Sequence, residues 1–410
     1  MKRIIVGQSG GPTAVINSSI AGVYKKAKEL GVEKVYGMVH GIEGFLQEDF
    51  IDLDDYLSDK NNYELLKRTP SAFLGSCRYK LPKIEGNEDV YEKIFKIIEK
   101  NKIDAFFYTG GNDSMDTIKM LSDYAKEHNK KCLFVGVPKT IDNDLPITDH
   151  CPGYGSAAKY IANSLKEIIR DNASFGKSRL TVCIVEIMGR HAGWLTAAAS
   201  LCKDDTCEGV DAIYLPEVDF DMNEFLDNIK RLAKKKSSIV IAVSEGIKTK
   251  DGKFVCEIGD EDRKVDAFGH KQLSGCASTL ANIVAKETGL KTRAIEFSTL
   301  QRAATHLASL TDIKEAEKVG IAAVESANKG KTGVMVVLER KDNTKYTCKT
   351  NVFDIHNIAN VEKKVPLEWI DLKNNQMKKE YLEYARPLIQ GELKPVFKDG
   401  VVVHLVRKEN

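Results

Sequence analysis

Short apolar runs rich in β-branched residues recur along the chain, and each ends near a glycine-rich or polar turn. They occupy residues 3–11, 103–111, 132–140, 179–190, 237–246 and 332–340. Several are followed by segments with apolar residues at helical spacing, such as AAKYIANSLKEIIRD. Strands separated by helices predict a parallel sheet with right-handed crossovers, and runs without strict alternation indicate strands covered on both faces. The pattern therefore predicts an α/β fold, in which two lobes exchange chain segments.

Composition limits the function classes that need to be considered for this chain of 410 residues. Lys plus Arg total 61 and Asp plus Glu total 59, a balance of +2 that argues against general nucleic-acid or membrane-surface binding. Nine cysteines occur without a CxxC spacing, which is typical of reduced thiols. No run is long enough for a signal peptide or a membrane span. We therefore expect a cytoplasmic protein that binds neither nucleic acid nor membranes.

Polar or glycine-rich turns follow five of the predicted strands. They contain Gly10 and Gly11, Gly110 to Ser114, Lys139 to Asp144, Met188 to Arg190, and Ser244 to Gly246. In open parallel sheets, ligands bind beyond the carboxyl ends of the strands. We therefore expect these turns to form one cleft.

The first two turns have the composition of phosphate-binding loops. In QSGGPT, Gly10 and Gly11 would present N–H groups at a helix start, where the helix dipole favours anions. A plain tight turn between strand and helix is the alternative. The second turn, GGNDSMDT, carries Asp113, a negative charge where a phosphate loop usually has none.

The segment PKTIDND (138–144) is more specific because it places two acids directly after a buried strand. One of Asp142 and Asp144 could take a proton from a hydroxyl nucleophile while the other helps to hold a metal. A solvated loop with an Asx turn is the alternative.

Several arginines and one glutamate follow later strands. Arg190, Arg293 and Arg302 could bind anions, and Glu245 could accept hydrogen bonds from sugar hydroxyls. Each could equally be structural, and His191, which lacks metal-ligand spacing, is interpreted as structural. Two glycine turns, an acid pair, a lysine and several arginines together predict phosphoryl transfer onto a phosphorylated hydroxyl compound.

Taken in order, SGG, GGNDS, PKTIDND, MGR, SEG and TLQR resemble the motifs of the 6-phosphofructokinase family over most of residues 1–340. The resemblance implies two Rossmann-like lobes, each a mostly parallel sheet flanked by helices, with the active site in the cleft between them. It places a donor lobe at 1–153 plus about 297–345 and a sugar-phosphate lobe at 154–296 plus about 346–410. It implies glycolytic phosphoryl transfer to the 1-hydroxyl of fructose 6-phosphate, Mg²⁺, and a homodimer or homotetramer whose subunits share sites.

The resemblance also implies residue roles. Asp142 resembles the base that deprotonates the sugar hydroxyl, and Arg302 resembles the arginine that holds the 6-phosphate. The other substrate-binding residues implied are Thr140, Ile141, Asp144, Met188, Gly189, Arg190, Glu245, Arg293 and Thr299, and the donor-binding residues are Gly10, Gly11, Arg78 and Ser114.

Two positions resemble the pyrophosphate-dependent branch of the family. Where ATP-using members have glycines, this chain has Asp113 and Lys139, and Ile42 replaces a tyrosine expected to lie against adenine. A carboxylate at Asp113 would repel the α-phosphate of ATP, while pyrophosphate stops short of it. Lys139 would stabilise charge on the transferring group.

One position departs from the family's pattern, because Asn112 stands where members carry a metal-binding acid. An amide oxygen can still contact Mg²⁺ or its water, so the metal-binding set is predicted to be Asn112, Asp113 and Asp144. Two alternatives to a pyrophosphate-dependent enzyme stay open. One is an ATP-dependent sugar-phosphate kinase, and the other, which Asn112 motivates, is a non-catalytic regulatory subunit that binds a sugar phosphate.

Overall fold

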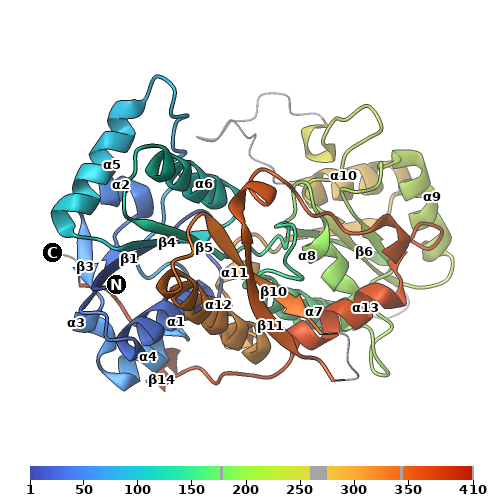
Figure 1. The fold of residues 1–410 in the computed structure, drawn as a ribbon. Helices are drawn as coiled ribbons and strands as arrows, with labels where there is room; N and C mark the ends of the chain where they lie inside the picture. Colours follow the sequence, from blue (N-terminus) through green and yellow to red (C-terminus); the bar gives the residue numbers. More distant parts are fainter. Residues whose placement is uncertain (176–178, 259–274, 342–344, 409–410) are drawn as a thin grey trace.

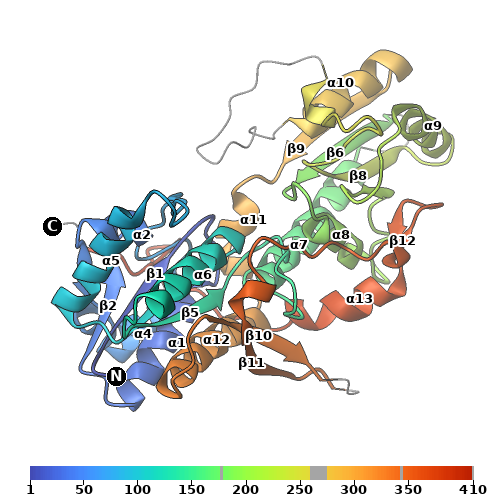
Figure 2. The same ribbon diagram turned by 45° about the horizontal axis from the view of Figure 1, so that its top comes forward.

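The computed structural model describes residues 1–175, 179–258, 275–341 and 345–408, which form two lobes joined by several chain crossings (Figure 1, Figure 2). Each lobe is built on a mostly parallel sheet with helices on its faces, so the predicted two-lobed α/β fold is confirmed. No helix in the described ranges is long and apolar enough to cross a membrane.

The larger lobe contains a seven-stranded sheet. Its strands, in spatial order, are β11 (Cys348–Asp354), β10 (Val334–Arg340), β5 (Leu133–Pro138), β4 (Ala105–Gly110), β1 (Arg3–Gln8), β2 (Lys34–Met38) and β3 (Phe50–Asp52). The five inner strands pair in parallel, and the two edge strands, β11 and β3, pair antiparallel.

Helices cover both faces of this sheet because its strands are apolar on both sides. Ile5 and Phe106 pack on one face with α5 (Glu88–Asn101) and α6 (Asn112–Glu127). Ile4 and Phe107 pack on the other with α1 (Ile16–Glu29) and α12 (Leu310–Asn328). Three short helices lie in the chain near the β2–β3 edge: α2 (Gly41–Leu46), α3 (Asp54–Leu57) and α4 (Lys60–Leu66).

The smaller lobe contains a four-stranded parallel sheet. Its strands, in spatial order, are β7 (Ala212–Tyr214), β8 (Ser238–Ser244), β6 (Thr181–Ile187) and β9 (Lys291–Glu296). Its helices are α7 (Tyr154–Ala173), α8 (Trp194–Ala197), α9 (Met222–Ala233) and α10 (Cys276–Thr288), and α11 (Leu300–Ala303) follows β9. Val185 packs with α7 on one face, and Ile184 packs with α9 and α10 on the other.

The C-terminal segment crosses between the lobes twice, which corrects the predicted division of the chain. The prediction assigned residues 346–410 to the sugar-phosphate lobe, but β11 is an edge strand of the larger sheet. The chain then crosses to the smaller lobe, where it forms α13 (Lys379–Ala385) and a hairpin of β12 (Ile370–Asp371) and β13 (Gln376–Met377). It returns through β14 (Phe397–Lys398) and β15 (Val401–Val402) to the larger lobe, where Leu405 N donates to Thr69 Oγ1 at 2.9 Å.

The six strands predicted from apolar runs all form, within a few residues of the predicted bounds. One predicted feature differs, because the helix after the first glycine turn begins only at Ile16. Gly10 and Gly11 therefore lie in bends of the connection before α1 and not at a helix start. Gly10 adopts a positive φ of 72°, which a glycine adopts without strain.

Candidate active site

A cavity of about 670 Å³ lies at the carboxyl ends of β1, β4, β5, β6 and β8, where the sequence analysis predicted a cleft. It brings together most of the predicted site residues: Gly10, Gly11, Arg78, Asn112, Asp113, Ser114, Lys139, Thr140, Ile141, Asp142, Asp144, Met188, Arg190, Glu245 and Arg302. A larger hollow of about 1290 Å³ lies beside α7, but it contains none of the residues that the motifs single out. The chemistry therefore belongs to the smaller, central cavity.

The acid pair lies on a turn that directly follows β5. Asp142 N donates to Thr140 Oγ1 at 3.0 Å, and Thr140 N donates to Pro152 O at 3.3 Å, so the turn is fixed at its start. Burial, together with the negative charge of Asp144, raises the pKa of the Asp142 carboxyl above its ordinary value. Burial also raises the pKa of Asp144. A carboxyl with a raised pKa is suited to accept a proton near neutral pH.

Lys139 links this turn to the first glycine turn. Its side chain is only 3% exposed, and Nζ donates to Gly11 O at 2.6 Å. Burial lowers the pKa of Lys139 to about 8, which leaves most of the ammonium charged at neutral pH. A Cβ on Gly11 would lie 2.8 Å from Arg302 Nη1, so the glycine allows the guanidinium to approach the backbone.

The second glycine turn brings β4 into the start of α6. A Cβ on Gly110 would lie 1.8 Å from Ser114 Oγ, so this close approach requires glycine. Ser114 was predicted to bind the donor, and its hydroxyl hydrogen-bonds Ser9 Oγ at 2.9 Å. Ser114 therefore also ties the β4 turn to the β1 turn. Asp113 lies exposed in the first turn of α6 and lines the cavity beside them.

The MGR and SEG turns pack closely against each other at the end of the cavity opposite the two glycine turns. Gly189 N donates to Glu245 Oε1 at 3.3 Å, and Ser244 Oγ donates to the Gly189 carbonyl. A Cβ on Gly246 would lie 2.0 Å from Arg190 O, so only a glycine fits between the turns. Burial raises the pKa of Glu245 to about 7.

Arg302 lies on α11 and points into the cavity. Burial and the positive charge of Arg78 lower the pKa of its guanidinium, while Asp142 and Glu245 act in the opposite direction. Arg78 belongs to a loop that is held against the first glycine turn, because Ser76 Oγ donates to Gly10 O at 2.6 Å. Two arginines that repel each other across a cavity favour an anion between them.

Three predicted site residues do not line the cavity. Gly189 acts through its N–H on Glu245, as described above. Arg293 was predicted to bind substrate, but it lies on the edge strand β9, where Nη1 contacts Asp171 Oδ2 at 3.4 Å and the guanidinium stacks over Phe175. Thr299 was also predicted there, but it is exposed and precedes α11. Arg293 pairs with Cys183 in the middle of β6, whereas the cavity residues of this lobe follow the carboxyl ends of β6 and β8. The register of β9, which a motif does not reveal, therefore places Arg293 outside this chain's cavity.

Other cavity residues were not predicted: Ser9, Pro12, Cys77, Tyr79, His191, Asn360 and Glu362. Ser9 is the first residue of the SGG motif and His191 directly follows MGR, so their position next to Gly10 and Arg190 was the available signal. Asn360 and Glu362 come from the C-terminal segment, which contains no recognised motif. Ile42 is buried in α2 and is not among the cavity residues.

Two neighbouring oxygens in the cavity suit a hard cation. Asn112 Oδ1 and Asp144 Oδ1 are buried without a hydrogen-bond partner among the described residues, while Asn112 Nδ2 lies 3.5 Å from Asp144 Oδ2. The described residues contain no cluster of three or more His, Cys, Asp or Glu side chains arranged for a metal. Mg²⁺ is usually held by one or two carboxylates together with water and substrate phosphates. The two oxygens therefore fit a magnesium ion that a phosphate completes.

A two-lobed α/β fold with acids, a buried lysine and arginines around one central cavity defines an α/β phosphotransferase. The family model described as phosphofructokinase matches residues 3–327, and the chain belongs to this family. The predicted family membership is thereby confirmed.

Known proteins resemble the chain over nearly its whole length. It is 40% identical over 402 residues to pyrophosphate–fructose 6-phosphate 1-phosphotransferase of Methylococcus capsulatus, covering 98% of this chain and 94% of that protein. It is 41% identical over 390 residues to the protein of the same name from Xanthomonas campestris pv. campestris, covering 95% and 92%. The crystal structure of a pyrophosphate-dependent phosphofructokinase from Nitrosospira multiformis superposes with a TM-score of 0.88 at 37% identity, covering 100% of this chain and 98% of that chain.

Proposed function

We propose that this protein transfers a phosphoryl group from pyrophosphate to the 1-hydroxyl of fructose 6-phosphate, giving fructose 1,6-bisphosphate and orthophosphate. The observation that carries this proposal is that Asp113 and Lys139 line the same cavity as the acids Asp142 and Asp144. Relatives that are named for this activity, and that the chain matches over more than 90% of their length, support it. We expect the transfer to be readily reversible.

Asp142 is the general base. Its carboxylate takes the proton of the 1-hydroxyl while the hydroxyl oxygen bonds to a phosphorus atom of pyrophosphate and the bond to the leaving orthophosphate breaks. A base positioned in this way contributes about 10²–10⁴-fold to the rate. Burial raises the pKa of Asp142 toward neutral pH. The same carboxyl can therefore accept a proton in the forward transfer and return it in the reverse transfer.

The sugar phosphate lies at the end of the cavity formed by the MGR and SEG turns. Arg302 binds the 6-phosphate, Glu245 accepts hydrogen bonds from sugar hydroxyls, and Arg190 with Met188 lines the same end. Thr140 and Ile141 complete the substrate wall. In phosphoryl transfer the protein mainly positions the reactants and stabilises charge.

Asp113 and Lys139 select the donor. Pyrophosphate lies between the two glycine turns, and the charge of Lys139 stabilises the transferring group in a buried site. The carboxylate of Asp113 occupies the position where a longer donor would place a further phosphate, and it repels that charge. Arg78, on the loop bonded to the first glycine turn, supports the donor from the other side.

Asn112 and Asp144, with Asp113 nearby, would hold Mg²⁺ between the donor turn and the acid turn. When bound, the ion neutralises charge on the phosphates. Glu362 adds a negative charge at this end of the cavity, which raises the pKa of both Asp142 and Asp144 further. This chain thereby offers an additional acid near the position where it carries Asn112.

We place the protein in the cytoplasm as a glycolytic enzyme that forms a homodimer or homotetramer. Its nine cysteines, which lack the spacing of a disulfide framework, support the reducing compartment. Arg293, which lies outside its own chain's cavity, is available to contribute to a site shared with a second copy.

The direct test offers the purified protein fructose 6-phosphate and Mg²⁺ with either pyrophosphate or ATP. We expect product formation with pyrophosphate and at most traces with ATP. Activity with ATP alone would contradict the donor assignment and identify an ATP-dependent kinase. Binding of fructose 6-phosphate without turnover of either donor would identify a regulatory subunit.

A further inference from the structure

The turn that carries Asp142 and Asp144, called the catalytic turn from here on, has a residue with an unfavourable backbone conformation between its two acids. Asn143 is fully buried and has a left-handed backbone conformation, with φ at 55°. This conformation costs a residue with a Cβ about 1 kcal/mol or more, although asparagine tolerates it better than most. It also sets the directions of Asp142 and Asp144 on either side. The contacts of Asn143 therefore determine how both carboxylates enter the cavity.

A tyrosine from the C-terminal segment makes the decisive contact. Asn143 Oδ1 accepts a hydrogen bond from Cys151 N at 2.9 Å, and Asn143 Nδ2 donates to Tyr384 Oη at 2.7 Å. The Tyr384 hydroxyl in turn donates to Asp149 O at 2.8 Å. One side chain of α13 thus joins the catalytic turn to the backbone that follows it.

The same C-terminal segment contacts the turn at a second point. Lys363 N donates to Asp144 O at 2.7 Å, and Lys363 Nζ donates to Thr148 O at 3.1 Å and Asp149 O at 2.8 Å. Trp194 Nε1 donates to Lys363 O at 2.9 Å, which fixes this part of the segment to the smaller lobe. The C-terminal segment therefore holds the turn at two points, Lys363 and Tyr384.

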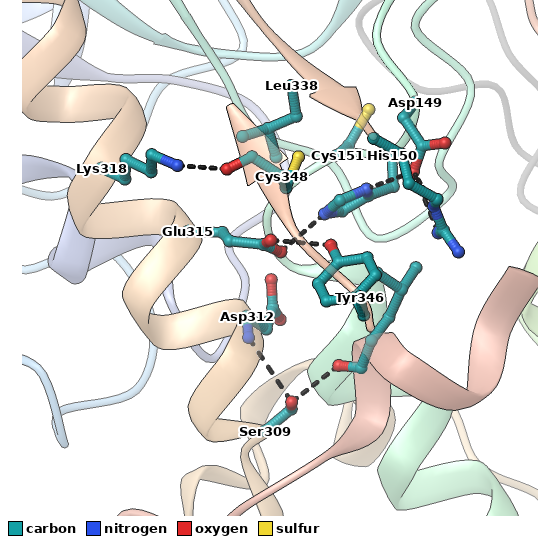
Figure 3. A network of polar contacts seen from close by, with 12 residues as sticks. Asp149, His150, Cys151, Ser309, Asp312, Glu315, Lys318, Leu338, Tyr346 and Cys348 are labelled. Atoms are coloured by element: carbon teal, nitrogen blue, oxygen red, sulfur yellow. Dashed lines mark hydrogen bonds and ion pairs between the residues drawn. The ribbon is translucent and has the colours of Figure 1, made fainter. Parts of the chain in front are cut away.

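The acceptor of the Tyr384 hydroxyl is held in place by a buried ionic network (Figure 3). His150 lies between Asp149 Oδ1 and Glu315 Oε2, each at 2.7 Å, and Tyr346 Oη donates to Glu315 Oε1 at 2.7 Å. Arg340 Nη2 donates to Asp149 Oδ1 at 3.0 Å. Glu315 belongs to α12 and Arg340 to β10, so this network is fixed to the larger lobe.

Helix α13 itself belongs to the core of the smaller lobe. Tyr381 and Ala385 are buried there with Trp194 and with Ile141 of the catalytic turn. Tyr384 therefore connects elements of both lobes at the position of the acid pair, although it is not among the residues that line the cavity.

We propose that Tyr384 is a positioning residue for Asp142, because its hydroxyl holds Asn143 and thereby the turn that directs both carboxylates into the cavity. The proposal rests on the proposed function, since it concerns the same base. A displacement of the reacting groups by about 1 Å can cost about 10²-fold in rate. The loss of one anchoring hydrogen bond, with Cys151 and Lys363 still in place, is expected to cost less than this.

Tyr384→Phe tests the proposal because it removes only the hydroxyl. We expect kcat to fall about tenfold while KM for fructose 6-phosphate changes less than about twofold, since Arg302 and Glu245 keep their places. Tyr381→Phe is the matched control. It lies in the same helix, and its hydroxyl bonds Tyr154 Oη at 2.6 Å and Trp194 O at 3.1 Å, away from the turn. It should lower Tm to a similar extent and leave kcat unchanged.

A double-mutant cycle separates positioning from general loosening. Asn143→Gly keeps the left-handed backbone accessible and removes the side chain that Tyr384 holds. In that background Tyr384→Phe should change kcat by less than about twofold. A tenfold effect in both backgrounds, or full kcat in Tyr384→Phe alone, would overturn the proposal.

Amide hydrogen exchange tests the same contact without turnover. Exchange at the N–H groups of residues 142–144 should be faster in Tyr384→Phe than in Tyr381→Phe, and equal rates would also overturn the proposal. If the wild-type protein used neither donor, the proposed function would fail, but this exchange difference would still decide the role of Tyr384.

Discussion

The acids at the two ends of the cavity lie in opposite environments. Asp113, at the donor end, is exposed in the first turn of α6. Asp142 and Glu245, toward the sugar end, have carboxyls whose pKa values are raised by burial, that of Glu245 to about 7. An enclosed acid can exchange a proton near neutral pH, whereas an exposed acid supplies a fixed negative charge. Under the proposed function, the same residue type would serve proton transfer at one position and exclusion of a longer anion at the other.

Removal of the enclosed base should have the largest effect. Asp142→Asn keeps the shape of the side chain but cannot accept the proton of the sugar hydroxyl, so kcat should fall about 10²–10⁴-fold. Binding of fructose 6-phosphate, measured by calorimetry, should change little, because Arg302 and Glu245 hold the sugar. The exposed acid provides the comparison, and Asp113→Asn should reduce kcat much less. A fully active Asp142→Asn variant would show that this residue is not the base.

The exposed acid should instead control the donor. In the variant Asp113→Gly with Lys139→Gly, kcat/KM for pyrophosphate should fall about 10²-fold, because the charged ammonium group of Lys139 is lost from a buried site. The same variant should gain measurable activity with ATP, because the repulsion of its additional phosphate is gone. Lys139→Gly alone should lose pyrophosphate activity without this gain. An unchanged donor preference in the double variant would place selectivity elsewhere in the cavity.

The pH dependence of the reaction should follow the enclosed acids. Asp142 acts as a base only when it is deprotonated, and burial has raised its pKa. The value of kcat/KM should therefore fall as the pH decreases below about 7, by up to about tenfold per pH unit. Asp113→Asn should keep this acidic limb, since its carboxyl takes no part in proton transfer. A rate that stays constant down to about pH 5 would show that the base has the ordinary pKa of an aspartate.

Sequence patterns predicted those parts of the site that are determined locally. The turns after β1, β4, β5, β6 and β8 could be recognised because each follows an apolar strand directly, and parallel strands bring their ends together. Their glycines follow from close contacts within a turn or with the next one, as at Gly110 and Gly246. Residues 8–13 were predicted less well, because the start of α1 depends on tertiary packing as well as on the glycine pair.

The remaining parts depend on contacts between distant segments. Tyr384 and Glu362 reach the site only because the C-terminal segment crosses to the smaller lobe, and no local pattern specifies such a crossing. Arg293 was predicted in the site by resemblance, but the register of β9 places it beside the middle of β6 and not at the end of a strand. His150 could not be distinguished from an ordinary buried histidine, because its partners Asp149 and Glu315 are 1 and 165 residues away in the chain.

The smallest effect is expected from this histidine, whose charge stabilises the fold behind the site. Burial alone would lower the pKa of His150, but Glu315 and Asp149 outweigh it and raise the pKa from 6.5 to about 9. Because the folded state binds this proton more tightly, its contribution to stability is complete below about pH 6.5 and is lost as the pH rises through about 9. In the folded protein the neighbours Arg340 and Tyr346 also face this cluster.

Thermal unfolding of the wild type and of His150→Gln, measured between about pH 6 and pH 10, isolates this contribution from the other groups that titrate there. The variant should have a Tm lower by a few degrees near pH 6, and the difference should shrink toward pH 10 as the wild type loses its charged histidine. His306→Gln, at a histidine outside this network, should show no such convergence. A difference between wild type and His150→Gln that is independent of pH would mean that His150 stabilises the fold by packing and not by its charge.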